Sequence, residues 1–406
     1  MEIVLAAHHL NLPVGAATYL LTVAGHLERL GHGVTVFTRD AGPLAERARE
    51  SGLRVALGEN LPDRCDAAIT QDAGCAYSLA ERYPEAPQVF VAHSVRFDFE
   101  LPPQLPGTVA AVVVMNDHVA RRVRAGGLEQ RVVRLRQPVD LERFRPPLAP
   151  RSRARRAVLL GNNLRDARRE MLVAALQRAG IEWSQFGTTG EGGVELDPAV
   201  VLRDADIVIG YGRAVLEGMA CGAAAYVYDT ALDGWVTPES YAAIEADGFA
   251  GRATGASATP ERLAEDLAAW TPELGVAGRE LCFAHHSPYT HSTALAELLT
   301  GLGRREPPAD PVVAELSRMA RVQWATHLRA LHHAEEALEA HRRARELEEA
   351  LAAAQALGEA QAHDARTELA ALKGTRRYRL AGALARPLDR GRDAVGRDRG
   401  RRRADG

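Results

Sequence analysis

The chain has few of the residues that build a disulfide framework, a metal site or a membrane span. Its four cysteines, Cys65, Cys75, Cys221 and Cys282, lie far apart without a CxxC pair, so we expect them to be reduced and structural. No apolar run reaches the roughly 18 residues of a membrane span. The first residues, "MEIVLAAHH", lack the basic region of a signal peptide. These absences predict a cytoplasmic protein without a metal.

Common signatures of phosphate and metal binding are also missing. No GxGxxG follows the first apolar run, which continues as "HHLNLPVGAA", and no GxxxxGK[ST] occurs, which argues against hydride transfer and a P-loop. The histidine pairs at 8/9, 285/286 and 332/333 lack HExxH spacing. Asp204-Ala205-Asp206 runs into "IVIG", which favours a helix cap and a strand start over a metal-binding triplet.

Lysine is almost absent, and positive charge is concentrated at the C-terminal end. Lys373 is the only lysine among 50 basic residues. Residues 374–406 hold eleven arginines and four aspartates, or +7, so the total of −3 leaves −10 for residues 1–373. The tail beyond Gly391 is expected to be disordered. Residues 374–390 are a candidate for contact with an anionic membrane surface; a basic tail with no partner is the alternative, and nucleic acid is disfavoured because aromatic residues do not interleave with the arginines.

Short apolar runs alternate with helical patterns through residues 1–147. Continuous apolar runs suit strands of a parallel sheet that is covered on both faces. Between the first two runs, "GAATYLLTVAGHLERLGH" has apolar residues at helical spacing and ends at Gly31. The prolines and arginines of residues 148–156 predict a linker. The expected strands are "EIVLAA", "GVTVFT", "DAAIT", "QVFVAH", "AAVVVM" and "RVVRLR".

The same alternation resumes over residues 157–301. Three Thr-Pro-Glu triplets, at 237–239, 259–261 and 271–273, predict helix starts, with threonine as the N-cap and proline at the first helical position. The chain is therefore predicted to be an α/β protein of two doubly wound, Rossmann-like domains facing across a cleft. The expected strands of this part are "AVLLG", "IEWSQFG", "ADIVIG" and "AAAYVYD".

Residues 312–373 are dominated by alanine, glutamate, leucine and arginine, which predicts helix. Leucines form a loose seam that is interrupted near residues 341–346 and near Gly358. We expect a helical hairpin or a weak coiled coil, and therefore a candidate region for self-association.

The segment "GYGRAVLEGMACG", residues 210–222, combines a strand end, a glycine turn and a helix start. A helix that starts near Arg213 presents free backbone N–H groups at the carboxyl edge of the sheet, where open α/β folds bind anions. Glu217, one turn later, is placed to accept hydrogen bonds from a ribose diol. The alternative is a tight strand-to-helix turn with an exposed glutamate.

This segment resembles the donor-binding segment of family 4 glycosyltransferases of the GT-B fold, whose helix carries a motif that ends in "EAMACG". The glycine turn before the first helix, "VAHS" after a strand, and "QPVDLERFRP" before the linker agree with that family. The resemblance covers residues 1–300. It implies transfer of a sugar from a UDP- or GDP-linked donor to a glycan or lipid-linked acceptor, in cell-surface polysaccharide synthesis, with no other cofactor.

The resemblance also implies which residues carry the reaction. Glu217 would hold the ribose, and His93 in "VAHS" would face the reacting sugar. The backbone N–H groups of Gly212, Arg213 and Ala214 would bind the diphosphate, and Gly15 would form the corresponding turn of the first domain. The expected donor-binding set is Gly15, Gly161, Asn162, Gly210, Tyr211, Gly212, Arg213, Ala214 and Glu217.

The sequence departs from the family at three positions. Ile209 stands where the family has the first glutamate of its pair, and Asn162 and Ala167 stand where it has the cations that clamp the diphosphate. Arg165 and Arg168 are the nearest cations, and we expect them to stabilise the leaving group.

Several mechanisms and functions stay open. A retaining, metal-independent transfer needs no protein base and is favoured, whereas an inverting transfer would need one, for which His93 is the candidate. The alternatives to a transferase are a degenerate GT-B-like scaffold that acts through its C-terminal helices, and a nucleotide-sugar epimerase.

Overall fold

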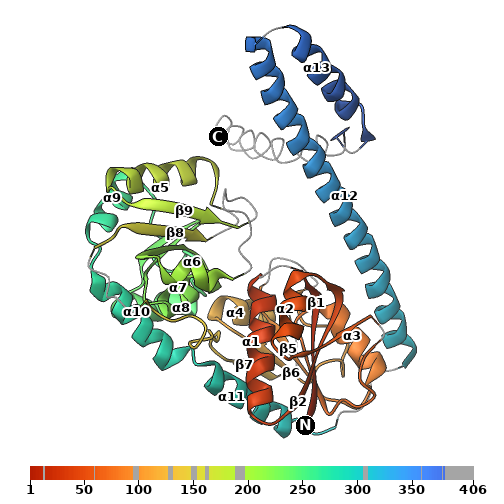
Figure 1. Ribbon diagram of the computed structural model, residues 1–406. Helices are drawn as coiled ribbons and strands as arrows, with labels where there is room; N and C mark the ends of the chain where they lie inside the picture. The colour runs from red at the N-terminus through yellow and green to blue at the C-terminus, as the bar shows by residue number, and fades with distance from the viewer. Residues whose placement is uncertain are drawn as a thin grey trace, which may run out of the picture. The chain divides into compact units, whose positions relative to one another are not determined.

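The computed structural model describes residues 1–379 apart from 12–13, 59, 95–99, 127–130, 148–152, 161–163, 188–196, 305–309, 358 and 377. The chain forms two compact units, Met1–Ser317 and the part from Arg318 onward (Figure 1). Asn162, Gly161, most of the predicted linker and the tail from residue 380 lie outside the described residues.

The first unit contains a parallel sheet of seven strands in the order β3-β2-β1-β4-β5-β6-β7. All six expected strands are present, and the sequence missed β3, a short edge strand with exposed and half-buried residues. Consecutive residues of β1 enter different cores, Ile3 and Leu5 on one face and Val4 and Ala6 on the other, which explains why the run is apolar throughout. The strands are β1 Glu2–Leu10, β2 Gly33–Ala41, β3 Arg54–Leu57, β4 Ala67–Thr70, β5 Gln88–Ala92, β6 Ala111–Val114 and β7 Arg131–Arg134.

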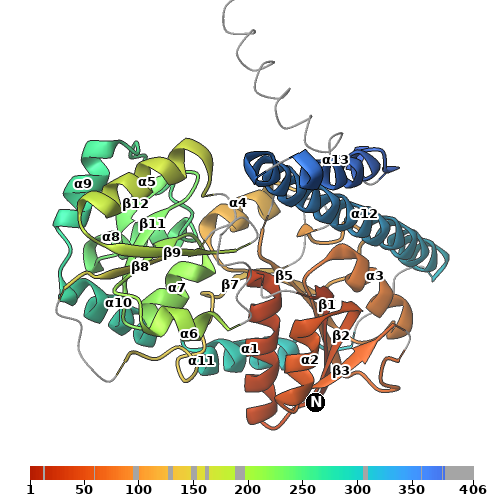
Figure 2. The same ribbon diagram turned by 45° about the horizontal axis from the view of Figure 1, so that its top comes forward.

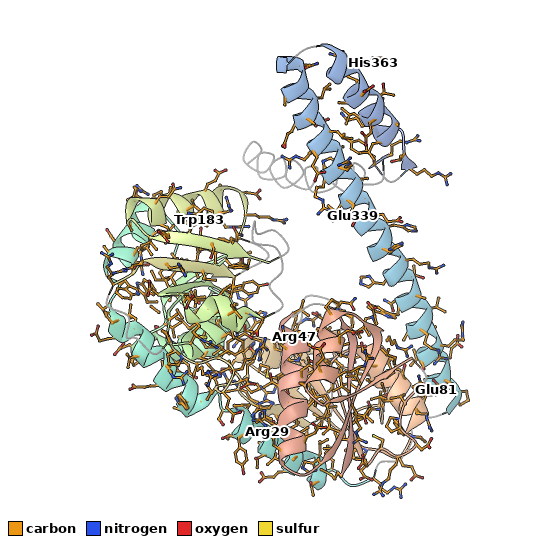
Figure 3. All side chains as sticks on the ribbon, viewed as in Figure 1. Arg29, Arg47, Glu81, Trp183, Glu339 and His363 are labelled. Atoms are coloured by element: carbon orange, nitrogen blue, oxygen red, sulfur yellow. The ribbon has the colours of Figure 1, made fainter. Side chains whose placement is uncertain are left out.

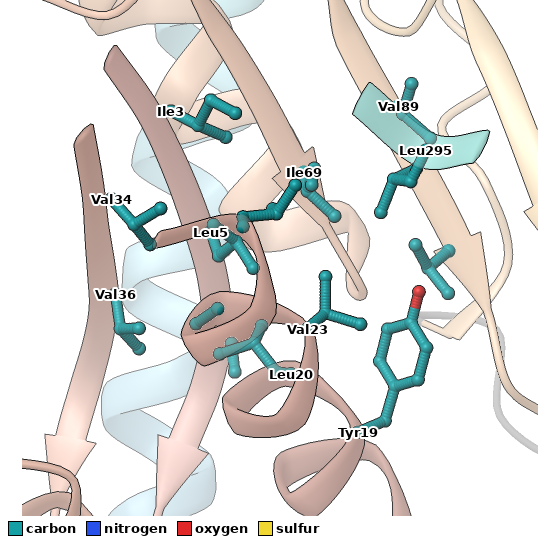
Figure 4. Close-up of a cluster of buried hydrophobic side chains, with 14 of the residues drawn as sticks. Ile3, Leu5, Tyr19, Leu20, Val23, Val34, Val36, Ile69, Val89 and Leu295 are labelled. Carbon is teal, nitrogen blue, oxygen red and sulfur yellow. The ribbon is translucent and has the colours of Figure 1, made fainter. Parts of the chain in front are cut away.

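Helices cover both faces of this sheet. Figure 4 shows Leu20 and Val23 of one helix packed with Ile3, Leu5 and Leu295 in a single buried cluster. That face carries α1 (Gly15–Arg29), α2 (Pro43–Glu50) and α11 (Pro288–Gly301), and the opposite face carries α3 (Ala73–Arg82) and α4 (Asp117–Ala125).

The second sheet has five strands in the order β12-β11-β10-β8-β9. The four expected strands pair in parallel, and β12, which the sequence analysis missed, pairs antiparallel with β11. Its segment "LDGW" lacks a strand-like run because Asp233 and Gly234 interrupt it. The strands are β8 Arg156–Leu160, β9 Glu182–Phe186, β10 Ile207–Gly210, β11 Ala224–Tyr228 and β12 Leu232–Trp235.

The helices of this sheet begin where the sequence predicted. The three Thr-Pro-Glu triplets open helices at Pro238, Pro260 and Pro272; the side chains of Thr237 and Thr259 accept N–H groups of the first turn, as N-caps do. One face carries α6 (Pro198–Arg203), α7 (Arg213–Ala220), α8 (Pro238–Ala246) and α10 (Pro272–His285), and the other α5 (Asp166–Arg178) and α9 (Pro260–Ala268).

The two sheets exchange segments across the predicted domain boundaries. Leu295 and Leu299 of α11 pack in the core of the first sheet, and Val139 and Phe144 pack in the core of the second. The boundaries predicted at 147 and 301 stay predictions, and segments next to them contribute to the core of the other sheet. Apolar periodicity shows that a residue is buried, but not against which sheet.

Ion pairs also join the two halves of the first unit. Arg47 of α2, labelled in Figure 3, lies 3.3 Å from Asp197 before α6. Arg134 at the end of β7 lies 2.7 Å from the buried Glu245 of α8. These contacts join elements of the first sheet to elements of the second.

The second unit consists of helices, as expected for residues 312–373. Helix α12 (Asp310–Leu357) begins in the first unit and continues into the second, where α13 (Glu359–Lys373) packs against it (Figure 2). Ala344, Leu347 and Leu369 form the buried part of this contact, while Leu338 is 68% exposed. The apolar seam is therefore short.

Among the helices of the described residues, none is both long and apolar enough to cross a membrane.

Candidate functional site

The starts of α1 and α7 lie next to each other. Helix α7 follows β10 through Gly212, whose φ of 59° requires glycine, and α1 begins at Gly15. Neither helix has a side-chain N-cap hydrogen bond. A Cβ atom at Gly15 would lie 3.9 Å from the Cβ of Arg213. The structure thus brings together two predicted donor-binding residues and two positive helix ends.

The backbone around Gly212 differs from the prediction in one respect. The Gly212 N–H donates to the carbonyl of Phe249 at 2.8 Å, so it is not free for a diphosphate. The N–H groups of Arg213 and Ala214 belong to the first turn, where an α-helix provides no acceptor of its own. The predicted anion contacts therefore fall to these two groups.

The side chain of Arg213 is buried and bonded to three parts of the first unit. Its Nε donates to Oε1 of Glu217 at 2.8 Å, one Nη to the carbonyl of Pro138 at 2.9 Å, and the other to Oγ1 of Thr22 at 3.2 Å. Thr22 belongs to α1, and Pro138 lies in the segment between the two sheets. The sequence pattern predicted a role for the Arg213 backbone but not for its side chain, although the i,i+4 spacing to Glu217 is a signal of such a pair.

Glu217 is 6% exposed, so the alternative of an exposed glutamate is wrong. Burial raises the pKa of Glu217, and the Arg213 guanidinium acts against that rise. The carboxylate already accepts one hydrogen bond from Arg213, and a ribose diol would have to share it. The role of Glu217 toward ribose stays a prediction.

His93 follows β5 and is partly buried beside α1. Its ring lies 4.6 Å from that of Tyr19, edge to face. Burial, the nearby Arg213 guanidinium and His291 lower the pKa of His93 to about 3. Its Nε2 is buried without a hydrogen-bond partner among the described residues. The imidazole is therefore neutral, with one ring nitrogen left for a ligand.

Tyr19 links the site to α11, a contact that the sequence analysis missed. Its hydroxyl lies 2.8 Å from Nε2 of His291, and Nδ1 of His291 lies 2.9 Å from the carbonyl of Arg136. The ring nitrogen that faces a carbonyl must be the donor, so the other accepts from the tyrosine. Because these residues are up to 272 positions apart, no local pattern predicts them.

The chain resembles solved glycosyltransferase structures over about three quarters of its length. WaaG, a glycosyltransferase involved in lipopolysaccharide biosynthesis, matches with a TM-score of 0.50 and 12% identity over 74% of this chain and 100% of its own. Sucrose-phosphate synthase from Thermosynechococcus elongatus matches with a TM-score of 0.47 and 16% identity over 74% of this chain and 99% of its own. The chain has the GT-B fold. No family model and no curated protein sequence matches it.

Within the GT-B fold, the remaining predicted residues have different environments. A Cβ at Gly210 would lie 2.3 Å from the Leu160 carbonyl, so close packing of β10 on β8 requires this glycine. Tyr211 follows it in the turn before α7. Ile209 is fully buried in the core beneath α5 and α9, so the position of the family's first glutamate contributes no charge.

Two predicted cations lie at the start of α5, after the carboxyl end of β8. Arg165 is its exposed N-cap residue and makes no side-chain cap, while Arg168 is half-buried in the first turn. The structure places both on the same sheet edge as α7, since β8 and β10 are parallel neighbours. Their role at the leaving group stays a prediction.

Asp204 and Asp206 have structural roles in the GT-B fold. Asp204 ends α6, and Asp206 accepts the backbone N–H groups of Arg155 and Arg156 at 2.8 and 2.9 Å. A helix end and a strand start were expected here, and both are confirmed.

Proposed function

We propose that this protein is a glycosyltransferase that moves a sugar from a UDP- or GDP-linked donor to a glycan or lipid-linked acceptor. The observation that supports this most directly is the approach of the two uncapped helix starts at Gly15 and Arg213. Two positive helix ends at one point favour an anion such as a diphosphate. The donor nucleotide would then extend toward Glu217 on α7, alongside Tyr211 and Ala214.

Charge stabilisation at the leaving diphosphate is the main catalytic requirement. Breaking the bond between the sugar and the phosphate builds negative charge on the diphosphate, and fixed donors that face this charge lower the barrier. In the proposal, the Arg213 and Ala214 N–H groups supply donors, and Arg165, with Arg168, supplies positive charge. Gly161 and Asn162 complete the donor contacts after β8. Removing one such donor typically costs about 10²- to 10³-fold in rate.

We propose a retaining, metal-independent transfer. In a front-face reaction the acceptor hydroxyl forms the new bond to the anomeric carbon, the old bond to the diphosphate oxygen breaks, and that oxygen takes the acceptor's proton. An inverting reaction needs a protein base. Because His93 has its pKa lowered to about 3, it is a weak base. It suits a hydrogen bond to the reacting sugar through Nε2.

The test is a screen of nucleotide sugars for nucleotide release with the full chain, followed by NMR assignment of the anomeric configuration of the product. We expect release with a UDP- or GDP-sugar that requires an acceptor, and retention of configuration. Turnover without acceptor would indicate an epimerase instead, and inversion would refute the retaining mechanism.

A variant pair tests the site itself. Glu217→Gln keeps the shape of the side chain but removes its charge, and we expect weaker nucleotide binding and about 10²-fold slower turnover. Glu46→Gln on the exposed face of α2 is the matched control and should leave both unchanged. Unchanged nucleotide affinity and turnover in a folded Glu217→Gln protein would show that the donor does not use this site.

A scaffold without catalysis is the second candidate, because Ile209 is buried where the family has a glutamate and Ala167 replaces a cation. Calorimetry with UDP and GDP separates the two proposals. Absence of heat with either nucleotide in a folded sample would favour the scaffold, which would act through α12 and α13. We also propose self-association through these helices. A further proposal is contact of residues 374–390 with the inner face of the cell membrane.

A further inference from the structure

We propose a divalent metal site formed by His8, Asp72 and Cys75, which takes a cation of borderline softness such as Zn²⁺. His8 belongs to β1, while Asp72 and Cys75 belong to the start of α3. The β1–β4 pairing ends with Ala6 opposite Thr70, and just beyond these residues the side chains of His8 and Asp72 lie 3.5 Å apart. Cys75 follows in the first turn of α3. Sequence spacing did not reveal the set because 64 positions separate His8 from Asp72.

The distances suit a single small cation. Nδ1 of His8 lies 3.5 Å from Oδ1 of Asp72, and the ligand atoms of all three residues lie within 4.8 Å of one another. With metal–ligand bonds of about 2.0–2.3 Å, two ligands of a tetrahedral zinc ion are about 3.3–3.8 Å apart. The histidine–aspartate distance already has this value. A side-chain movement of about 1 Å would bring the Cys75 sulfur within bonding distance of the same ion.

Asp72 has one oxygen that the protein does not use. Oδ1 accepts the Cys75 N–H at 2.7 Å as the N-cap of α3 and faces His8. Oδ2 is buried and has no hydrogen-bond partner among the described residues, in a residue that is 4% exposed. A buried carboxylate oxygen without a partner is costly. A cation held at this carboxylate would balance its buried negative charge.

The charge state of Asp72 fits this role. Burial acts to raise its pKa, but the His8 ring and the Cys75 N–H outweigh that effect and hold the pKa of Asp72 below its usual range. Asp72 is therefore ionised at neutral pH and carries a negative charge that no arginine or lysine pairs with among the ion pairs of the described residues.

Cys75 is fully buried, and burial together with Asp72 raises the pKa of its thiol. Without a metal the thiol keeps its proton. A bound divalent cation replaces that proton, which passes to solvent, and the sulfur becomes a thiolate ligand. Arg39, close enough to act against the rise in the Cys75 pKa, also favours the thiolate.

The donor set selects the class of metal. One imidazole nitrogen, one thiolate and one carboxylate suit Zn²⁺ and related transition metals, whereas Mg²⁺ and Ca²⁺ require oxygen ligands. The His8 side chain is 17% exposed, which gives solvent and a metal ion a route to the site. The bound ion would link the end of β1 to the start of α3. This inference does not depend on the proposed glycosyltransferase activity.

Cobalt titration of the full chain, stripped with a chelator, tests the site. A thiolate bound to Co²⁺ gives a strong charge-transfer band in the near ultraviolet, and we expect this band to saturate at one Co²⁺ per chain and to disappear when Zn²⁺ is added. The expected affinity rises with pH because binding releases the thiol proton. Saturation without the band, or no binding, would overturn the proposal.

Variants assign the band to the three residues. Cys75→Ser should abolish it, while Cys282→Ser, an equally buried cysteine of α10, should leave it unchanged. His8→Gln, at a partly exposed position, should weaken Co²⁺ binding at least about tenfold. Circular dichroism checks that each variant folds. If Cys75→Ser does not fold, His8→Gln decides the question: wild-type affinity in that variant would overturn the site.

Discussion

Two arginine–glutamate pairs at helical spacing in this chain have opposite environments. Arg213 and Glu217 of α7 have side chains that are 7% and 8% exposed, whereas Arg343 and Glu346 of α12 are 58% and 54% exposed. The local sequence pattern is nearly the same. A buried pair depends on its remaining partners, here Thr22 and Pro138, while an exposed pair contributes little in water. Helical spacing alone therefore does not show what a charge pair does.

The largest expected effect comes from breaking the buried pair. Arg213→Met leaves Glu217 buried without its cation, and we expect a loss of about 3–5 kcal/mol in the free energy of unfolding. Arg343→Met is the matched exposed control and should change it by less than about 0.5 kcal/mol. Urea denaturation measures both. The double variant Arg213→Met/Glu217→Met should recover much of the loss, because no unpaired charge is left. Equal losses in the free energy of unfolding for the two single variants would show that burial does not distinguish the two pairs.

The second prediction concerns acid. Burial lowers the pKa of His286 and of His291 to about 4, and that of His93 to about 3, from an ordinary value of 6.5. As the pH falls, the histidines of the unfolded chain take up protons at a higher pH than those of the folded protein. The free energy of unfolding is therefore greatest above pH 6.5 and falls as the pH drops toward 4. At about 1.4 kcal/mol per pKa unit, His286 and His291 each contribute at most about 3 kcal/mol and His93 at most about 5 kcal/mol. His291→Asn should flatten this pH dependence, while His333→Asn, 63% exposed on α12, should not. A free energy of unfolding that stays constant between pH 6.5 and 4 would contradict the prediction.

Two glycines within helices also differ in environment, and their substitution is expected to have a smaller effect on stability. A Cβ at Gly218 of α7 would lie 2.6 Å from the Cβ of Val208, whereas one at Gly25 of α1 would meet nothing within 4 Å. Gly218→Ala should therefore destabilise the protein by about 1–3 kcal/mol. Gly25→Ala should stabilise it by about 0.5–1 kcal/mol through helix propensity. Thermal unfolding of the two variants checks the opposite signs, and the same sign for both would show that packing on β10 is not the cause.

The smallest effect is expected from the helical unit. Because the first unit has its own cores, a chain that ends at Ser317 should unfold at nearly the same temperature and keep its nucleotide turnover within about twofold. Its self-association, measured by sedimentation, should be reduced. Unchanged sedimentation would argue against self-association through α12 and α13, and lost turnover would show that this unit supports the site.

Much of the fold could be predicted from the sequence, because strands and helix starts depend on residues that are close together in the chain. Ten of the strands were recognisable as apolar runs, and the Thr-Pro-Glu triplets marked helix starts that the structure confirms. The two missed strands, β3 and β12, are edge strands whose residues are half exposed or interrupted by glycine. Their pairing comes from the neighbouring strand rather than from their own pattern.

The candidate site was predictable only in part. The glycine turn and the start of α7 could be read from spacing, since helix starts and strand ends are local features. The burial of Glu217, the contacts of the Arg213 side chain and the ring contact between His93 and Tyr19 could not, because they depend on which elements fold against them.

The sequence by itself determined two α/β halves, a helical extension and the glycine-framed start of α7, because apolar periodicity and capping act over a few residues. Only the tertiary structure decided that Arg213 meets Thr22 and Pro138, which are 191 and 75 positions away. It also decided that α11 completes the first core and that His8 meets Asp72 and Cys75. These contacts join distant segments, and only the packing of whole sheets and helices brings such segments together.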